Sequence, residues 1–211
     1  MEHPKIVEDY LTAGSFFDIY NEEDYYLHNR ILKGEIVEQE IIRHPILEQA
    51  VLDHVTFINC DFNKIDLTDV VFKICNLSNC TFDEASIYRV EFQNCKLMGT
   101  NFDGSFLNNV VFKNCQMDLV NLNRLNLKTV QFMDDSLKDA SFNENKLTKT
   151  SFKNCNLDKM NLMGTKLKGL DLSSCTFETI DIEQELAKGL KVNADQASFL
   201  ARYFLGVTVV Y

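Results

Sequence analysis

The sequence predicts an all-β solenoid built from short, four-sided coils. From Leu52 to Ile182 an apolar residue returns at every fifth position without a break, in a chain of 211 residues. A period of five fits neither a helix, with about 3.6 residues per turn, nor a strand, with its period of about two. It therefore indicates an internal repeat in which the chain turns a corner every five residues.

The composition of the repeat predicts the number of corners in one coil. We call the apolar residue the central position. Phenylalanine occupies it at intervals of 20 residues, in two series that are two repeats apart and separated by aliphatic residues. The first series is Phe72, Phe92, Phe112, Phe132 and Phe152, and the second includes Phe62, Phe82, Phe102 and Phe142. This superperiod means four corners per coil, so residues 35–189 make about seven and a half coils.

Two further positions of the repeat have a regular composition. The position two residues before the centre, here called the small position, holds all seven cysteines, which are Cys60, Cys75, Cys80, Cys95, Cys115, Cys155 and Cys175. Their spacing lacks the short ligand pairs of zinc sites, so we expect buried thiols that act as small hydrophobes. The position two residues after the centre, here called the corner position, holds seven of the eight glycines, which predicts an unusual backbone conformation there.

Asp135 and Asn145 are the notable polar residues at inward positions. Asp135 interrupts a column of cysteines. Because an unpaired buried carboxylate is costly, the sequence predicts a local bulge or a hydrogen-bonded turn at this residue.

Composition and charge limit the classes of function. The formal net charge of −10 and the pI of about 4.9 argue against direct binding to nucleic acid or to an anionic membrane. The chain shows no membrane-span or secretory-signal pattern, and its odd number of cysteines favours reduced thiols, so we expect a cytoplasmic protein. The four histidines form no ligand or triad spacing. A narrow packed rod also has little room for a ligand cleft, so we expect no enzyme, no cofactor and no metal.

Residues 1–34 are predicted to form an N-terminal lead-in before the coils. Val7–Leu11 and Phe16–Tyr20 are expected to form short helical turns that cover the open end of the solenoid, since a solenoid exposes its terminal coil. A partly ordered acidic segment is the alternative.

Residues 190–211 are predicted to form a C-terminal cap. Asn193 and Gln196 have the spacing of a capping box, which predicts a helix that runs to about Leu205 and stops at Gly206. Val207–Tyr211 is predicted as a short strand. The helix has two apolar faces, so one can cover the last coil and the other can contact a second chain. One face is Ala197, Leu200, Ala201 and Phe204, and the other is Phe199 and Tyr203.

The outward charges are sorted by face. The acidic face flanks the second phenylalanine series and consists of Asp61, Asp83, Glu84, Asp103, Glu144, Asp181 and Glu183, with Lys64 and Arg124 as its bases. The next face carries Arg89, Lys128, Lys146, Lys149, Lys166 and Lys168, with Asp66 and Asp69 as its acids. Ordinary solvated faces account for this pattern as well as a binding surface does. An acidic stripe on a rod near the width of a DNA duplex, about 20 Å, would suit a basic protein groove that normally holds DNA.

The repeat resembles that of the pentapeptide-repeat family, whose motif is A(D/N)LXX. Examples are Cys60-Asp61-Phe62-Asn63-Lys64, Cys75-Asn76-Leu77-Ser78-Asn79 and Cys155-Asn156-Leu157-Asp158-Lys159. The resemblance covers about 155 residues. It implies a right-handed quadrilateral β-helix.

The C-terminal segment is similar to the terminal helix of the Qnr and MfpA branch of that family. The similar stretch runs from Gly189 to Leu200 and closes with Leu205-Gly206-Val207. The resemblance implies a DNA mimic that binds DNA gyrase and topoisomerase IV, protects them against quinolones and forms a homodimer through this segment. The dimer contacts would come from Phe199, Leu200, Tyr203, Phe204, Val207 and Val209. Gram-negative Qnr chains interrupt the repeat with two loops, so the loop-free members are the nearer match.

A structural scaffold or an immunity factor that binds an unrelated protein is the alternative function. An affinity pull-down without topoisomerase subunits would favour it.

Overall fold

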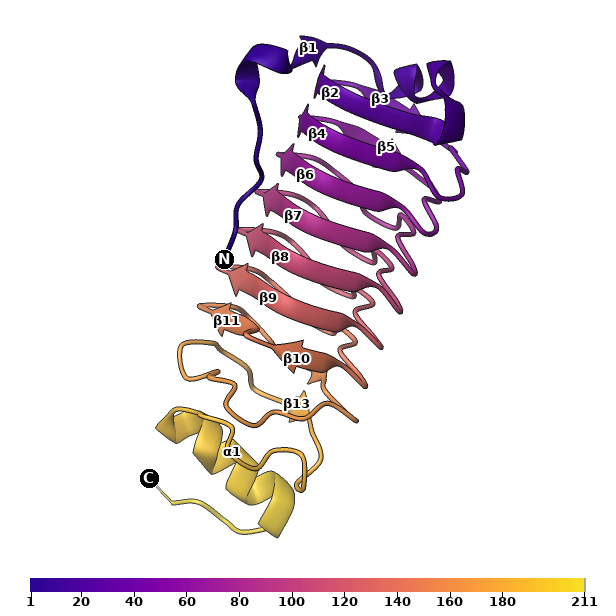
Figure 1. Cartoon of the computed structure of the whole chain (residues 1–211). Helices are drawn as coiled ribbons and strands as arrows, with labels where there is room; N and C mark the ends of the chain where they lie inside the picture. The colour runs from indigo at the N-terminus through magenta and orange to yellow at the C-terminus, as the bar shows by residue number, and fades with distance from the viewer. Residues whose placement is uncertain (211) are drawn as a thin grey trace.

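The computed structural model describes residues 1–210, the side chain of Glu8 excepted. The chain winds into a solenoid whose coils stack along one axis, with a helix at its C-terminal end (Figure 1). Within the described residues the main sheet has nine strands. They are β1 (Thr12–Ala13), β2 (Tyr26–Lys33), β4 (Ile46–Asp53), β6 (Asp66–Lys73), β7 (Ser86–Gln93), β8 (Phe106–Lys113), β9 (Asn126–Met133), β10 (Lys146–Thr148) and β11 (Ser151–Lys153). All pairs are parallel, and from β2 onward they join residues one 20-residue coil apart, which confirms the predicted all-β solenoid.

The eight-residue strands span two sides of each coil, and shorter pairings hold the other two. β3 (Ile36–Glu38) pairs with β5 (Thr56–Ile58), and β12 (Met160–Asn161) pairs with β13 (Ile180–Asp181). Single bridges continue these sides through the intervening coils, as between Asn76 and Lys96. Successive coils are therefore hydrogen-bonded on all four sides.

The corner position has left-handed backbone, as the glycine pattern predicted. Gly99 and Gly104 have φ of 65° and 70°. Many residues with side chains adopt the same conformation, including Lys64 with φ of 60° and the β-branched Ile74 with φ of 53°. Left-handed backbone disfavours such residues, so the hydrogen bonds between coils hold the corners in place.

The core consists of stacked columns of central residues. In the first phenylalanine series neighbouring ring centroids are 4.6–5.0 Å apart and the rings are within 6° of parallel. Rings of the second series meet them edge to face, as Phe102 meets Phe112 at 6.2 Å and 77°. The in-register coils impose the stacking, because neighbouring strands lie about 4.8 Å apart.

At several small positions the side chain donates a hydrogen bond to the preceding coil. The Cys75 thiol donates to the Leu52 carbonyl at 3.4 Å, and the Thr100 and Ser105 hydroxyls donate to the carbonyls that lie 23 residues earlier. All seven cysteines are buried and free, as predicted. Small side chains with a donor are thus suited to this position, which explains why cysteine, threonine and serine share it.

Asp135 occupies the small position without a bulge. Its two carboxylate oxygens accept hydrogen bonds from the backbone amides of Cys115, at 2.7 Å, and Met133, at 2.9 Å. The neighbouring bridges keep the 20-residue register, so the hydrogen-bonded alternative of the prediction is confirmed. Burial raises the pKa of Asp135 to about 7, against the opposing effect of these two amides.

The regular coils begin earlier than the sequence predicted. β2 pairs with β4 from Tyr26 onward, and Leu27 and Leu32 are buried at central positions inside the predicted lead-in of residues 1–34. Polar residues around these two leucines had hidden the register. The first coil therefore starts at about Tyr26 rather than near Glu35.

Short 3₁₀ helices form in the lead-in, as predicted, and η2 covers the first coil. They are η1 (Glu8–Tyr10), η2 (Phe16–Asn21) and η3 (Glu23–Tyr25). Ser15 and Asp18 form a capping box at the start of η2, which fixes the direction of entry. The buried Phe16 ring lies 5.3 Å from the Phe57 ring and 5.5 Å from the Phe62 ring, so η2 closes the apolar core.

Residues 1–7, here called the N-terminal strap, run back along the outside of the solenoid (Figure 1). The Lys5 amide donates to Asp69 at 2.8 Å, the His3 ring contacts Glu91 at 2.7 Å, and the Glu2 amide donates to Asn109 at 2.8 Å. These contacts join β6, β7 and β8. The strap thus ties three successive coils together across their outer surface.

A nearly buried ion pair anchors the strap. Arg89 donates to both oxygens of Asp69 at 2.6 Å, and the side chains are 12% and 5% exposed. Burial alone would raise the pKa of Asp69, but the bonds from Arg89 and from the Lys5 amide outweigh it and lower the pKa.

Replacing Asp69 with alanine is expected to lower the free energy of unfolding by about 3 kcal/mol, because it strands the buried guanidinium and releases the strap. Urea unfolding followed by circular dichroism measures this loss, and hydrogen exchange should become faster in residues 2–6. Glu84→Ala is the matched control, since the Lys64–Glu84 pair is 56% and 61% exposed and should contribute less than about 1 kcal/mol. Equal losses in the two variants would contradict the anchoring role.

The C-terminal helix α1 (Ala194–Leu205) begins and ends where the sequence predicted. Asn193 and Gln196 form the capping box, and Gly206 ends the helix with φ of 65°. The predicted strand at Val207–Tyr211 is wrong for the described part, since residues 207–210 have no strand pairing, and Tyr211 lies outside the described residues. No described helix is long and apolar enough to cross a membrane.

Candidate partner-binding surfaces

The structure places all seven predicted acidic residues on one side of the solenoid, in three adjacent columns. Asp61 and Asp181 precede central residues, Asp83, Asp103 and Glu183 follow them, and Glu84 and Glu144 occupy corners. Because the coils are in register, residues of one column stack at about 4.8 Å. Asp83 and Asp103 are such neighbours, so the face concentrates negative charge along the axis.

Two bases partly neutralise this acidic face. Lys64 contacts Glu84 at 3.3 Å, and Arg124 binds both oxygens of Asp103, with its Nε at 2.9 Å. The Asp103 carboxylate raises the pKa of Arg124. The face is therefore less acidic than the list of its carboxylates indicates, and its middle coils carry an ion pair rather than free charge.

Some acidic residues also have a structural task. Asp61 accepts a hydrogen bond from the Asn63 amide and closes its own turn, and Glu183 accepts one from the Gly164 amide at 2.9 Å. Glu144 and Asp181 are exposed and make no ion pair among the described residues. The structure thus separates the acids that support turns from those that are available to a partner.

Asp83 differs from the other members of the face. Its Oδ1 is buried and has no hydrogen-bond partner among the described residues. Because this oxygen is buried, a partner on the surface cannot reach it, so Asp83 presents less of its charge to a partner than the exposed Glu84 does.

The C-terminal surface is built by the docking of α1 on the last coil. The buried Gln196 side chain donates to the carbonyls of Leu172, at 3.0 Å, and Cys175, at 2.8 Å. The Phe199 ring packs edge to face on Phe177 at 5.9 Å. These contacts fix the rotation of the helix about its axis.

The residues of α1 that contact the core do not follow the two faces that the sequence predicted. Phe199 and Phe204, which were placed on different faces and were both expected at the dimer contact, pack against the core together with Leu200. Tyr203 and Val207 are exposed, and Val209 is half-buried. Phe199 is drawn inward because the ring of Phe177 ends the core column beneath it.

The side of α1 that faces residues 184–190 borders an apolar groove that the sequence did not indicate. The groove has a volume of about 290 Å³ and is lined by Gln184, Ala187, Lys188, Leu190, Leu200, Ala201, Phe204 and Leu205. Leu205 is 66% exposed, and Val210 further along the chain is 88% exposed. No sequence pattern predicts this groove, because it forms between the helix and a turn that precedes it in the chain.

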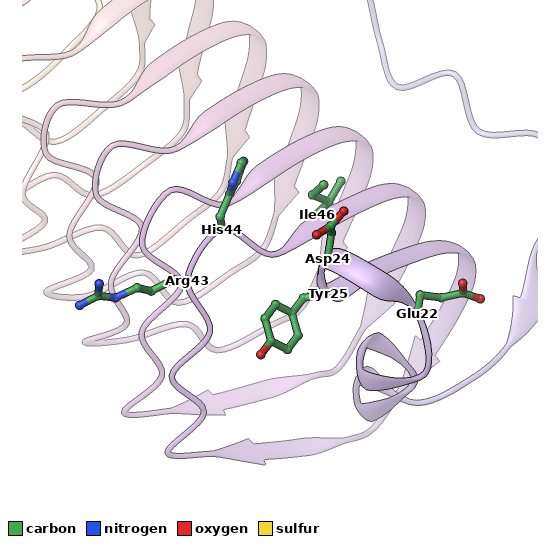
Figure 2. A pocket seen from close by; sticks show the side chains of 6 residues that line it. All are labelled: Glu22, Asp24, Tyr25, Arg43, His44 and Ile46. Atoms are coloured by element: carbon green, nitrogen blue, oxygen red, sulfur yellow. The ribbon is translucent and has the colours of Figure 1, made fainter.

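A second hollow, of about 680 Å³, lies beside the N-terminal helices. Figure 2 shows that the side chains of Arg43 and Glu22 point away from each other. His44 contacts Asp66 at 3.0 Å and is thereby engaged outside the hollow. The lining side chains do not converge on one point, so we assign no chemistry to this hollow.

Metal-binding residues do not gather in the described part of the chain. Within residues 1–210, leaving out the Glu8 side chain, no group of three or more His, Cys, Asp or Glu side chains could hold a metal ion. The cysteine columns donate to backbone carbonyls instead.

Comparison with protein families gives matches to two repeat models. A model of a pentapeptide repeat region matches residues 65–141 and 85–162, and a model of eight pentapeptide repeats matches residues 42–73. No curated protein matches the chain.

Solved structures of repeat proteins are similar to the chain. A trypsin-treated variant of QnrB1, described as a plasmid-mediated fluoroquinolone resistance protein, is 20% identical, with a TM-score of 0.47; the alignment covers 88% of this chain and 100% of that one. HetL, a pentapeptide repeat protein involved in heterocyst differentiation regulation from Nostoc sp. strain PCC 7120, is 15% identical, with a TM-score of 0.36 and coverage of 81% and 85%.

Proposed function

Because the chain belongs to the pentapeptide-repeat family, whose models together match residues 42–162, we propose that it binds a protein partner through its acidic face. The proposed partner is a type II DNA topoisomerase, either DNA gyrase or topoisomerase IV. The chain would occupy the basic surface that normally holds DNA and would thereby lower quinolone sensitivity. It would act without catalysis, in the cytoplasm, where such a partner works.

The observation that carries this proposal is the alignment of carboxylates along one side of a straight rod. Glu84, Glu144 and Asp181 are exposed, and each lies on the same side, several coils from the next. A row of negative charges along a rod resembles the phosphate rows of a duplex in the sign of its charge. Such a row complements a basic groove, and complementary fields of this kind increase association rates and specificity.

The C-terminal segment supports the choice of partner. Its sequence from Gly189 to Leu200 is similar to the terminal helix of the Qnr and MfpA branch, and this similarity is independent of the charges on the acidic face.

Supercoiling by purified gyrase in the presence of ciprofloxacin tests the proposal. We expect added protein to restore supercoiling, and absence of rescue at every protein concentration would overturn the proposal. The triple variant Glu84→Lys, Glu144→Lys, Asp181→Lys should need at least about tenfold more protein for the same rescue, because it places positive charge against the basic groove. None of these three side chains supports a turn, so the solenoid should stay folded.

A matched control changes the same charge on another side. Glu38, Asp139 and Glu178 are exposed acids outside the acidic face. The variant Glu38→Lys, Asp139→Lys, Glu178→Lys should keep its potency within about twofold. An equal loss in both variants would mean that net charge, rather than the acidic face, determines rescue.

We further propose that two copies of the chain pair through their C-terminal segments. Leu205 lines the apolar groove of α1 and is exposed, and Val207 and Val210, which follow it in the chain, are exposed apolar residues as well. Burying them against a second copy would remove this surface from water and give the unpaired residues 207–210 a partner for strand pairing. Of the six residues predicted for the dimer, Tyr203 and Val207 are the ones available for contact, while Phe199, Leu200 and Phe204 position the helix.

Light scattering tests the dimer. The intact chain should have twice the 24.3 kDa mass of one copy, and the variant Leu205→Glu, Val207→Glu should have the mass of a single copy. The control is Ile36→Glu, Ile41→Glu at the other end of the rod, where both isoleucines are exposed, at 62% and 74%. A monomeric intact chain, or a dimer that survives the first pair of substitutions, would contradict this proposal.

A further inference from the structure

The C-terminal coils carry a group of exposed lysines beside the acidic face. They occupy outward positions that flank the central residues Leu127, Leu147 and Leu167. We call this group the lysine patch, and it consists of Lys128, Lys146, Lys149, Lys166 and Lys168, all of which are exposed.

The lysine patch has no counter-charge. In the part of the chain that the structure describes, none of its five ammonium groups lies within 4.0 Å of a carboxylate. The nearby Lys188 contacts Glu185, so it has a counter-charge and does not belong to the patch. In the N-terminal coils the same side of the rod is balanced, because Arg89 there is bound to Asp69.

This concentration of charge is unfavourable for the isolated chain. Lys146 is in register with Asn126 one coil earlier, and Lys166 follows Lys146 by one further 20-residue coil. Coils stack at about 4.8 Å, and like charges directly opposite each other are destabilising. The fold does not require lysine here, since Ser86 and Asn108 occupy equivalent outward positions in other coils. The lysines therefore lower the stability of the rod without a structural benefit.

We propose that the lysine patch is a binding surface for a carboxylate-rich, extended segment of a protein. The patch is about one side wide, roughly 10 Å, and extends over three coils, roughly 10 to 15 Å. An extended segment of about four residues has this length. The patch is made of lysines, which are mobile point charges, and it lacks the planar, bidentate groups that arginine offers to phosphate. Mobile ammonium groups suit carboxylates spaced along a flexible segment.

Larger polyanions fit this surface less well. A nucleic acid duplex or an anionic membrane extends beyond the patch and would lie close to Glu144 and Asp181 on the adjoining acidic face. The net charge of −10 repels both at distances beyond the patch. A short acidic segment avoids these contacts. This inference does not depend on what the acidic face binds.

Fluorescence anisotropy with a labelled decaglutamate peptide tests the proposal on the full chain. We expect saturable binding that weakens as salt is raised, because exposed charges are screened over about 8 Å at physiological ionic strength. The variant Lys146→Glu, Lys149→Glu, Lys166→Glu should weaken binding by at least about tenfold. The variant Lys146→Gln, Lys149→Gln, Lys166→Gln should weaken it as well, which shows that loss of charge suffices.

The matched control reverses three exposed lysines that lie along another side of the rod. Lys33, Lys73 and Lys113 share one column there with Asp53 and Gln93 between them. Lys33→Glu, Lys73→Glu, Lys113→Glu changes the net charge equally and should leave decaglutamate binding within about twofold. An equal loss in this control, or no binding at low salt, would overturn the proposal. Tighter binding of a labelled duplex or of anionic vesicles, abolished by the Lys146 variant, would also overturn it, because the patch would then serve another class of partner.

Discussion

Replacing Phe112 with alanine is expected to lower the free energy of unfolding by about 3 to 5 kcal/mol. The Phe112 ring is completely buried in the middle of the first phenylalanine series, 4.9 Å from the Phe92 ring and 5.0 Å from the Phe132 ring. The surrounding coils cannot close the cavity, because hydrogen bonds on all four sides hold them at the strand spacing. Urea unfolding followed by circular dichroism measures the loss.

A phenylalanine on the outer surface of the same strand is the control for this substitution. Phe106 begins β8 and is 38% exposed, so Phe106→Ala should cost less than about 1 kcal/mol. Phe112→Leu should cost less than Phe112→Ala, since Leu122 already replaces phenylalanine in the second series and is fully buried there. A small loss for Phe112→Ala would mean that the coils can move together and that the rod is less rigid than its hydrogen bonds indicate.

The stability of the chain is expected to fall as the pH rises from about 4 to about 7, through the titration of Asp135. Its pKa is raised from 3.8 to about 7 in the folded chain. Below the pKa that Asp135 has in the unfolded chain, both the folded and the unfolded states hold the proton. Between the two pKa values only the folded state holds the proton, because the unfolded state has already ionised. Each pH unit in this range therefore lowers the free energy of unfolding by about 1.4 kcal/mol. Above about pH 7 both states are ionised and the loss stops growing.

Asn145 shows why the neutral form is preferred at this position. It occupies the small position on another column, where its oxygen accepts from the Leu125 amide at 2.6 Å and its amide group donates to the Leu122 carbonyl at 2.9 Å. An ionised Asp135 can accept but cannot donate in this way. The variant Asp135→Asn cannot ionise; it keeps an acceptor for one of the two backbone amides and adds a donor, while the other amide loses its acceptor.

Asp135→Asn is therefore expected to stabilise the chain above pH 7 and to remove the loss between about pH 4 and 7. Urea unfolding of both chains at pH 4.5, 6 and 7.5 gives the difference at each pH. The control is Asp139→Asn, since Asp139 is exposed, does not contribute to the raised pKa of Asp135 and should leave the pH dependence unchanged. Parallel curves for the intact chain and Asp135→Asn would contradict the assignment of this titration to Asp135.

The repeat could be predicted because each inward residue has nearly the same surroundings in every coil. Leu97 and Phe102 are buried for the reason that Leu77 and Phe82 are, so the pattern of five and its superperiod of 20 specify the core directly. Local signals were equally informative at the C-terminus, where the capping box of Asn193 and the glycine at 206 gave both ends of α1. The start of the coils at Tyr26 was missed because polar residues weaken the pattern there.

The position of the acidic face could be predicted from the sequence, but the extent to which its charge is neutralised could not. Its members follow from the period, but the pairing of Asp103 with Arg124 joins residues 21 positions apart and depends on side-chain direction. Whether an acidic residue supports a turn, as Glu183 does for Gly164, also depends on where the next coil lies. The sequence thus located the surface, and the structure distinguished the carboxylates that remain available to a partner.

The sequence by itself determined the four-sided solenoid, the identity of the inward residues and the faces on which charges gather, because all of these follow from a short period that repeats. The tertiary structure alone decided where the strap lies, since Lys5 contacts Asp69 and Glu2 contacts Asn109, 64 and 107 residues further along the chain. It also decided that Phe199 turns inward on Phe177. These contacts join parts of the chain that share no period, so their geometry follows from packing rather than from spacing.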